Sequence, residues 1–313
     1  MNLKEIQRPV QALLDDTDGV LKQRARSEIA LVDKIGQVAP ISKGKKIRST
    51  LLFLLSGMNG SFHPQITEIA ASLEMFHLSS LIHDDIVDNS KFRRGEQTLH
   101  SNMGANISVM WGDYLFISAF TAINKLGIPF LMDITLKCAR LMIEGQLIEI
   151  ENISNLDVQK ETYYDIIGRK TSSLFAGVSH IAALLNNDSS ETQETFYQFG
   201  MDFGTIFQVS DDMLDIFSDT SGKDRFGDLN EGKITLPYIL LLKSCKKDIE
   251  TALAEKNGEK LIPFFNRYMI KDATLNEIDI YYKKALEFTN RFPASIYKES
   301  LIHLLNFIKY REY

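Results

Sequence analysis

The chain has 313 residues, of which 44% are hydrophobic and 24% charged, and its formal net charge is −6. This composition is typical of a globular protein with a substantial core. The acidic balance argues against nucleic-acid binding, which requires a basic face. The longest apolar runs, such as residues 51–55, fall far short of the ~20 residues of a membrane span. An apolar substrate would therefore be held inside the protein or met at a membrane surface, through peripheral contact for product release.

The N-terminal stretch carries charges throughout and has no apolar segment of the kind found in signal peptides. The two cysteines, Cys138 and Cys245, lie far apart and form no CxxC pattern. We therefore predict that both are reduced structural residues of a cytoplasmic protein, and that neither belongs to a zinc site.

Apolar residues recur at spacings of three and four along the chain, which predicts one helix after another. Residues 43–48 form a basic loop before an apolar helix, and residues 66–80 predict a helix that is apolar on most sides and central in a bundle. Polar residues 186–190 and 219–232 connect later helices, and the second segment, with three glycines, is the best candidate for a functional loop. Helix boundaries are predicted at Pro40, Pro64, Pro129, Pro263 and Pro293, with Pro237 in a first helical turn. We expect an all-α single domain over residues 1–313.

Two aspartate clusters share the pattern DDxxD: Asp84, Asp85 and Asp88, and then Asp211, Asp212 and Asp215. The first and last aspartates of each cluster lie four residues apart, so on a helix they share one face at about 6 Å. Such a pair suits Mg²⁺, which prefers oxygen ligands and keeps coordination positions for water and phosphate. The alternative is a solvated helix surface or ordinary salt bridges. Both clusters lie in apolar segments, however, where three carboxylates cost stability unless cations neutralise them.

Cationic residues accompany both clusters. Two arginines follow the first cluster and can clamp phosphate oxygens. The basic loop precedes a helix, and helix N-termini favour phosphate. The cationic and hydroxyl residues near the clusters are Arg93, Arg94, Arg169, Lys170, Thr171, Lys223 and Lys233. Together with the carboxylate pairs they predict a diphosphate held by several Mg²⁺ ions.

These motifs resemble the trans-polyprenyl diphosphate synthase family over nearly the whole chain. The resemblance rests on both aspartate-rich motifs, the G-K-x-x-R element at 44–48, and the segment D-L-x-E-G-K-x-T-L-P at 228–237. It implies an isoprenoid synthase-like bundle of roughly ten or more helices around a central cavity. It also implies a homodimer and several Mg²⁺ ions. The chain departs from the family's pattern at Ser49, where proline is common, and at Phe226, where the loop usually has glycine.

The resemblance also implies roles for individual residues. Isopentenyl diphosphate would be bound by Lys45, Arg48, His77 and Arg94. The allylic diphosphate would be bound by Arg93, Lys170, Thr171, Gln208, Lys223 and Lys233. The main magnesium ligands would be Asp84, Asp88 and Asp211, supported by Asp85, Asp212 and Asp215. Catalysis would depend on Asp84, Asp88, Arg93, Lys170 and Asp211. His77 has an alternative reading as a hydrogen-bonded core residue, although it lies nearly on the face of Asp84.

The reaction implied by the family is ionisation of the allylic diphosphate followed by condensation. Cations stabilise the leaving diphosphate. The double bond of isopentenyl diphosphate then attacks the allylic carbocation, and the new cation loses a proton to the departing diphosphate. In this family, bulk four or five residues before the first aspartate closes the pocket early, and Ser79 and Ser80 are small. Phe76 lies one helical turn, about 5.4 Å, before Ser80, further from the first aspartate. We predict that Phe76 is the floor of a pocket for a product of about C20 to C40. The alternative is that Phe76 only packs in the core.

Three other functions fit parts of the sequence. A non-catalytic subunit of a heteromeric prenyl synthase would be expected to lose one aspartate cluster, and this chain keeps both. A class I terpene cyclase shares the helical fold, but it has a mixed second motif and lacks the basic loop. An α-helical scaffold protein leaves the grouped acids and cations unexplained. We therefore favour a prenyltransferase.

Overall fold

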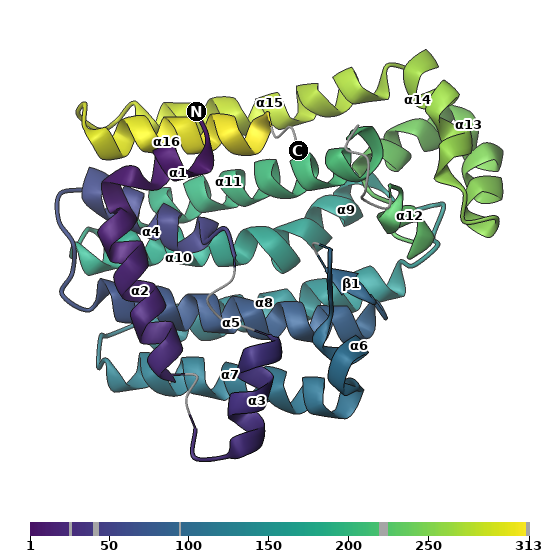
Figure 1. Ribbon diagram of the computed structural model, residues 1–313. Helices are drawn as coiled ribbons and strands as arrows, with labels where there is room; N and C mark the ends of the chain where they lie inside the picture. Colours follow the sequence, from purple (N-terminus) through teal and green to yellow (C-terminus); the bar gives the residue numbers. More distant parts are fainter. Residues whose placement is uncertain (25–26, 40–43, 94, 219–224, 311–313) are drawn as a thin grey trace. The chain divides into compact units, whose positions relative to one another are not determined.

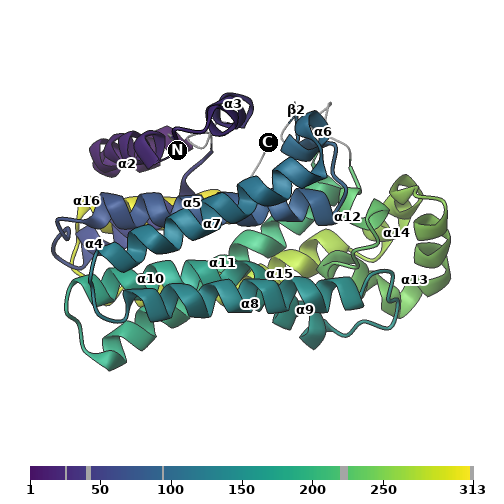
Figure 2. The same cartoon turned by 90° about the horizontal axis from the view of Figure 1, so that it is seen from below.

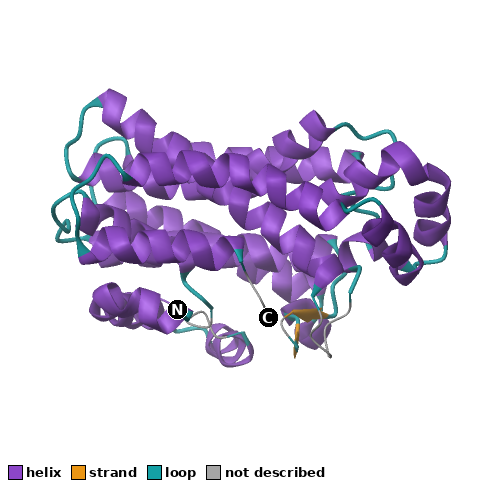
Figure 3. Ribbon diagram, turned by 90° about the horizontal axis from the view of Figure 1, so that it is seen from above, coloured by secondary structure: helices purple, strands orange, loops and turns teal. Residues whose placement is uncertain are grey.

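The computed structural model describes residues 1–24, 27–39, 44–93, 95–218 and 225–310. These residues are almost entirely helical, and the strands among them form one short antiparallel hairpin that pairs Phe92 with Gln97 and Arg93 with Glu96 (Figure 3). The prediction of an all-α fold is thereby confirmed.

Contacts between Cα atoms divide the chain into two compact units. The N-terminal unit comprises Gln7–Thr135 and Ile181–Asp188, and the C-terminal unit comprises Met1–Ile6, Leu136–His180 and Ser189–Tyr313. The helices α8 (Leu131–Glu151) and α10 (Ser173–Leu185) each contribute residues to both units. A single domain over residues 1–313 stays a prediction.

The N-terminal unit carries the first aspartate cluster. Its elements are η1 (Arg8–Val10), α2 (Gln11–Arg24), α3 (Ala30–Val38), α4 (Ile47–Met58), α5 (Ile66–Val87), β1 (Phe92–Arg93), β2 (Glu96–Gln97), α6 (Leu99–Met103) and α7 (Ala105–Lys125), with the end of α1 (Leu3–Gln7). α4 is buried over most of its length because its run Leu51–Leu55 is apolar on every side.

The helices α5 and α7 run side by side (Figure 2). Two residues explain their close approach. Ser79 is buried and donates a hydrogen bond from its hydroxyl to the carbonyl oxygen of Gly112, at 2.8 Å. A Cβ on Gly112 would stand 2.7 Å from His83 Cδ2, so a larger residue there would force the His83 side chain to move.

The C-terminal unit carries the second aspartate cluster. Besides most of α8 and α10, its elements are α9 (Lys160–Ile167), the π-helix η2 (Gly168–Ser172), α11 (Ser190–Phe217), α12 (Gly227–Asn230), α13 (Leu236–Ala254), η3 (Gly258–Leu261), α14 (Ile262–Arg267), α15 (Ile270–Thr289) and α16 (Ile296–Lys309). The helices α11 and α15 lie alongside each other (Figure 1). Phe199 of α11 stacks on Phe288 of α15, with 4.3 Å between the ring centroids.

Helix boundaries follow the prolines as predicted. Pro64 and Pro129 lie just before α5 and α8, and Pro293 lies between α15 and α16. Pro237 and Pro263 occupy the first turns of α13 and α14. Pro40 lies outside the described residues.

Three further predictions concern the cysteines, membrane-spanning helices and the loop 219–232. Cys138 and Cys245 are buried and unpaired, as expected for reduced structural residues. Within the described part of the chain, every helix is too short or too polar to cross a bilayer. The predicted loop 219–232 is described only from Arg225 onward, where it contains the short helix α12.

Candidate active site

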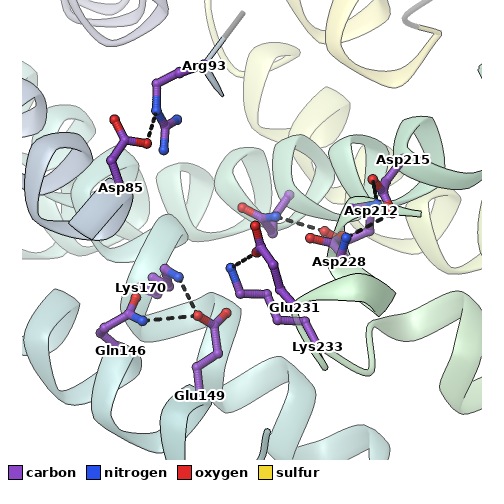
Figure 4. A network of polar contacts seen from close by, with 12 residues as sticks. Asp85, Arg93, Gln146, Glu149, Lys170, Asp212, Asp215, Asp228, Glu231 and Lys233 are labelled. Carbon is purple, nitrogen blue, oxygen red and sulfur yellow. Dashed lines mark hydrogen bonds and ion pairs between the residues drawn. The ribbon is translucent and has the colours of Figure 1, made fainter. Parts of the chain in front are cut away.

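The first aspartate cluster lies at the end of α5. Asp84 and Asp88 are half-buried, whereas Asp85 is buried. Asp85 Oδ1 accepts a hydrogen bond from Arg93 Nε at 2.7 Å (Figure 4). Burial raises the pKa of the Asp85 carboxyl, although the Arg93 guanidinium opposes this rise. The structure thus places Arg93, a predicted diphosphate ligand, on the middle aspartate of the cluster, and Arg94 lies outside the described residues.

The basic loop joins α4 through an unusual backbone conformation. Lys46 precedes the first residue of α4 and has φ of 49°, in the left-handed region. Lys45 comes just before it, and Arg48 lies buried in the first turn. The sequence predicted that this helix N-terminus would favour phosphate. The structure directs the Ser49 N–H to a carboxylate, Oε1 of Glu74, at 3.1 Å. Phosphate binding at this helix N-terminus stays a prediction. Lys43 lies outside the described residues.

The predicted product-length residues lie on α5 in different surroundings. Ser80 is half-buried and donates its hydroxyl to the carbonyl oxygen of His77, whereas Ser79 points to α7, as described above. Phe76 is buried and meets the edges of Phe116 and Phe120 of α7, with ring centroids 5.8 and 5.6 Å away. The candidate floor is therefore a cluster of three rings, two of which come from a helix that the sequence reasoning had not considered.

The second aspartate cluster borders a pocket of about 150 Å³ within the C-terminal unit. Four of the predicted allylic-diphosphate residues line this pocket: Lys170, Thr171, Gln208 and Lys233. Asp212 lines the same pocket, with Asp228 and Glu149. Residues from α8, α9, η2, α11 and the segment after α12 thus converge on one small space, which polar and apolar side chains line together. Lys223 lies outside the described residues.

A chain of hydrogen bonds fixes Asp212, the middle aspartate. Tyr163 donates its hydroxyl to Asp212 Oδ2 at 2.5 Å, and Gln208 Nε2 donates to Oδ1 at 2.8 Å. Gln208 Oε1 in turn accepts from the Thr171 hydroxyl at 2.8 Å. Burial raises the pKa of Asp212, and the neighbouring charges of Asp211 and Asp215 add to the rise, whereas the two hydrogen bonds oppose it. These contacts leave Asp212 well held within the pocket.

Asp215 organises the start of α12. Its Oδ1 accepts from the Gly227 N–H at 2.8 Å and its Oδ2 from the Asp228 N–H at 3.3 Å. Its backbone oxygen also accepts from the Phe226 N–H at 2.9 Å. Burial raises the pKa of the Asp215 carboxyl, and these backbone donors lower it. The last aspartate of the cluster therefore anchors the segment that leads to Lys233, whereas Asp211 is half-buried on α11.

Lys170 lies on the π-helix η2, an irregularity common at functional sites. Its Nζ donates to Glu149 Oε2 of α8 at 2.5 Å (Figure 4). α8 and η2 approach closely because residue 145 is glycine: a Cβ there would stand 2.6 Å from the Lys170 backbone nitrogen. On the other side, a Cβ on Gly204 of α11 would stand 2.8 Å from Ser172 Cβ. The placement of Lys170 and Thr171 thus depends on the close approach that Gly145 and Gly204 allow.

Sequence reasoning missed three acidic or hydroxyl groups of these surroundings: Glu74, Glu149 and Tyr163. Glu149 follows Gly145 by one helical turn, but it carries no motif of its own. Tyr163 and Glu74 lie far from their partners in sequence and carry no motif.

The donor chemistry of both clusters fits a hard cation, since carboxylates supply only oxygen. Among the described residues, no three His, Cys, Asp or Glu side chains are grouped closely enough to hold an ion by themselves. An ion held by one aspartate pair would therefore complete its coordination with phosphate oxygens and water.

Comparison with known proteins agrees with the site. A family model described as polyprenyl synthetase matches residues 30–262. The octaprenyl diphosphate synthase of Escherichia coli is 28% identical over 100% of both chains. Component 2 of the heptaprenyl diphosphate synthase of Bacillus subtilis is 29% identical over 96% of this chain and 89% of its own. Among solved structures, a polyprenyl synthase from Caulobacter crescentus, complexed with calcium and isoprenyl diphosphate, is 26% identical with a TM-score of 0.91 and covers 100% of this chain and 98% of that chain.

Proposed function

Because the chain belongs to the polyprenyl synthetase family, we propose that this prenyltransferase condenses isopentenyl diphosphate with an allylic diphosphate and releases a prenyl diphosphate longer than farnesyl. The observation that carries the proposal is the pocket in the C-terminal unit, which gathers Lys170, Thr171, Gln208 and Lys233 beside Asp212. Two ammonium groups, a hydroxyl and an amide around one space of about 150 Å³ suit a diphosphate.

Each group has a chemical task in this proposal. Lys170 and Lys233 stabilise negative charge on the leaving diphosphate, and Gln208 and Thr171 orient its oxygens by hydrogen bonds. Lys45, Arg48 and His77 of the N-terminal unit bind the diphosphate of isopentenyl diphosphate. Mg²⁺ ions bound through Asp84, Asp88 and Asp211 would supply further electrophilic stabilisation of the leaving group.

Lys170 has a resting partner that a substrate must displace. Its ammonium group is paired with Glu149, and both side chains are about four-fifths buried. A diphosphate carries more charge and more acceptor oxygens than one carboxylate, so it competes for the same ammonium group. We therefore expect Lys170 to exchange Glu149 for the allylic diphosphate on binding.

The product length follows from α5 in this proposal. Ser80 is small, and the next bulky side chain towards the N-terminus on this face is Phe76, packed against Phe116 and Phe120. Two similar proteins are named octaprenyl and heptaprenyl diphosphate synthases, which supports a product beyond farnesyl. The proposed product length stays at about C20 to C40. One helical turn of about 5.4 Å separates Ser80 from Phe76, the candidate floor.

The experiment that tests this function uses the purified full-length chain alone, labelled isopentenyl diphosphate, Mg²⁺ and a series of allylic starters. We expect label in diphosphate products longer than farnesyl. Release of cyclic hydrocarbon would favour a terpene cyclase instead. Turnover only after another protein is added would favour a subunit of a heteromeric synthase.

We also propose that the protein is a homodimer. On α8, Leu136, Ile143, Leu147 and Ile150 form one apolar stripe, and each is 46–60% exposed. An exposed apolar stripe of this length is typical of a protein interface. Within the N-terminal unit, Met110 and Ile117 of α7 are exposed at a seven-residue spacing, which suits the same purpose.

Light scattering after size-exclusion chromatography tests the dimer. We expect the mass of two chains for the wild type and of one chain for Leu147→Glu combined with Ile143→Glu. Ile280→Glu is the matched control, since Ile280 is equally exposed but lies on α15. A monomeric wild type that binds lipid vesicles through the α8 stripe would contradict the dimer and favour peripheral membrane contact.

A further inference from the structure

We propose that Glu74 and Gln7 are positioning residues for isopentenyl diphosphate, because together they fix the loop that presents Lys45 and Arg48. This inference rests on the proposed function, which assigns those two cations to isopentenyl diphosphate. Neither Glu74 nor Gln7 belongs to one of the sequence motifs described above. Both act through the backbone and first turn of α4.

Glu74 holds the first turn of α4 at Ser49. A single carboxylate oxygen, Glu74 Oε1, accepts from the Ser49 N–H at 3.1 Å and from the Ser49 hydroxyl at 2.7 Å. The Ser49 N–H is one of the first four amides of the helix, which have no partner within the helix. A carboxylate at this end also interacts favourably with the helix dipole. The turn that carries Arg48 is thereby tied to α5, three residues before His77, which lies on the same side of α5.

Gln7 holds the other side of the loop. Its buried side-chain amide, Nε2, donates to the carbonyl oxygen of Lys45 at 2.9 Å and to the Thr50 hydroxyl oxygen at 2.8 Å. Thr50 passes the constraint on, because its hydroxyl donates to the carbonyl oxygen of Lys46 at 2.7 Å. One amide group therefore fixes the carbonyl directions of two successive loop residues.

The loop needs such restraints because of Lys46. A lysine in the left-handed region is strained, and such a conformation persists only where its surroundings enforce it. The Lys46 ammonium group forms an ion pair with Asp18 of α2, so this side chain is directed to the protein and is only 14% exposed. Gln7 and Glu74 act on either side of the strained residue, at Lys45 and at Ser49.

Steady-state kinetics of the full-length protein with separately varied substrates tests the inference. Glu74→Leu removes both acceptor contacts and Gln7→Leu removes both donor contacts. We expect each to raise the KM for isopentenyl diphosphate about tenfold, the effect of losing one or two hydrogen bonds, with the KM for the allylic diphosphate unchanged. Glu74→Gln keeps an Oε1 acceptor for Ser49 and should restore most of the affinity.

A matched control separates positioning from general stability. Glu68 lies on the same helix and pairs with Arg24, away from the loop, so Glu68→Leu should lower the melting temperature without a selective change in KM. Ser49→Ala is the mild variant, since it keeps the N–H contact and loses only the hydroxyl contact; it should raise the same KM by a smaller factor. Ser49→Ala therefore tests the positioning role even if the leucine variants fail to fold.

The possible failures are distinguishable. A wild-type protein that never incorporates isopentenyl diphosphate would overturn the proposed function itself. An active wild type with an unchanged KM for isopentenyl diphosphate in Ser49→Ala and Glu74→Leu would overturn the positioning role alone. An equal rise of both KM values, or a Glu74→Gln variant as impaired as Glu74→Leu, would do the same.

Discussion

Phe226 packs its side chain against the backbone of Gly258, where a Cβ would stand only 2.6 Å from the Phe226 Cβ. Phe226 takes the left-handed conformation, with φ of 61°, and is 2% exposed. The position where the family usually has glycine thus keeps a glycine-like backbone and adds a buried ring. The ring fixes the start of α12, whose amide groups bind the carboxylate of Asp215.

The first prediction concerns this contact. Gly258→Ala should destabilise the protein by about 1–3 kcal/mol, because the ring must leave its place, and should also lower activity through Asp215. Phe226→Gly removes the obstacle and suits the positive φ. Phe226→Gly alone loses a buried ring, so the informative quantity is the cost of Gly258→Ala in that background, which we expect to fall close to zero in thermal unfolding. If Gly258→Ala costs as much stability beside Phe226→Gly as it does in the wild type, the contact is not the cause.

A second prediction concerns the glycine beneath η2. Gly204→Ala would place a Cβ 2.8 Å from Ser172 Cβ, so η2 must shift and carry Lys170 and Thr171 with it. We expect the KM for the allylic diphosphate to rise at least about tenfold, since even small misplacement of binding groups is costly. Gly168→Ala is the matched control within η2, because its Cβ would meet only Met201 Cε at 3.7 Å. Equal effects of the two substitutions on KM would refute this account of η2.

A third prediction concerns product length. Phe76→Ala removes the ring that meets Phe116 and Phe120, and we expect the released prenols to become longer by at least one isoprene unit on chromatography. The substitution also costs about 3–5 kcal/mol of stability, so Phe76→Leu should be made in parallel. Phe53→Leu, at a buried position of α4, is the control for loss of a core ring. If Phe76→Ala leaves product length unchanged, Phe76 only packs in the core.

A fourth prediction concerns the pH dependence of stability. Burial raises the pKa of Asp202 to about 6, although the charge of Lys284 opposes the rise. Between about pH 4 and pH 6 the folded state therefore binds more protons than the unfolded state, and stability falls as the pH rises. Above pH 6 Asp202 is ionised in the folded protein, where burial makes the charged form unfavourable. Asp202→Asn should thus stabilise the protein by about 1 kcal/mol at pH 8, after allowance for partial exposure to solvent.

Thermal unfolding at two pH values checks this sign. The gain from Asp202→Asn at pH 8 should vanish near pH 4, where the wild-type carboxyl is protonated in the folded state. A substitution that stabilises equally at both pH values would contradict the shifted pKa.

The helices and their boundaries could be predicted because their signals are local. The spacing of apolar residues and positions such as Pro237 and Pro263 depend on neighbours within a few residues. The same holds for the pairing of the aspartates within each cluster. The grouping of Lys170, Gln208 and Lys233 in one pocket was implied only by the family resemblance, since no periodicity connects them.

The positioning contacts could not be predicted, because they join residues distant in sequence. Tyr163 and Asp212 are 49 residues apart, and Ser49 and Glu74 are 25 apart. Ser79 was predicted only as a small residue that leaves room for product. Its hydroxyl instead binds α7, a role that depends on which helix lies opposite. Phe226 is the same case, since the room for its buried ring depends on the missing side chain of Gly258.

The most direct test of the central claim is the length of the product released by the purified chain from labelled isopentenyl diphosphate, farnesyl diphosphate and Mg²⁺. The account predicts a linear prenyl diphosphate longer than farnesyl, and no such product from variants that carry Asp84→Asn or Asp211→Asn. The account is contradicted if a folded wild type that elongates shorter allylic starters leaves farnesyl diphosphate unchanged.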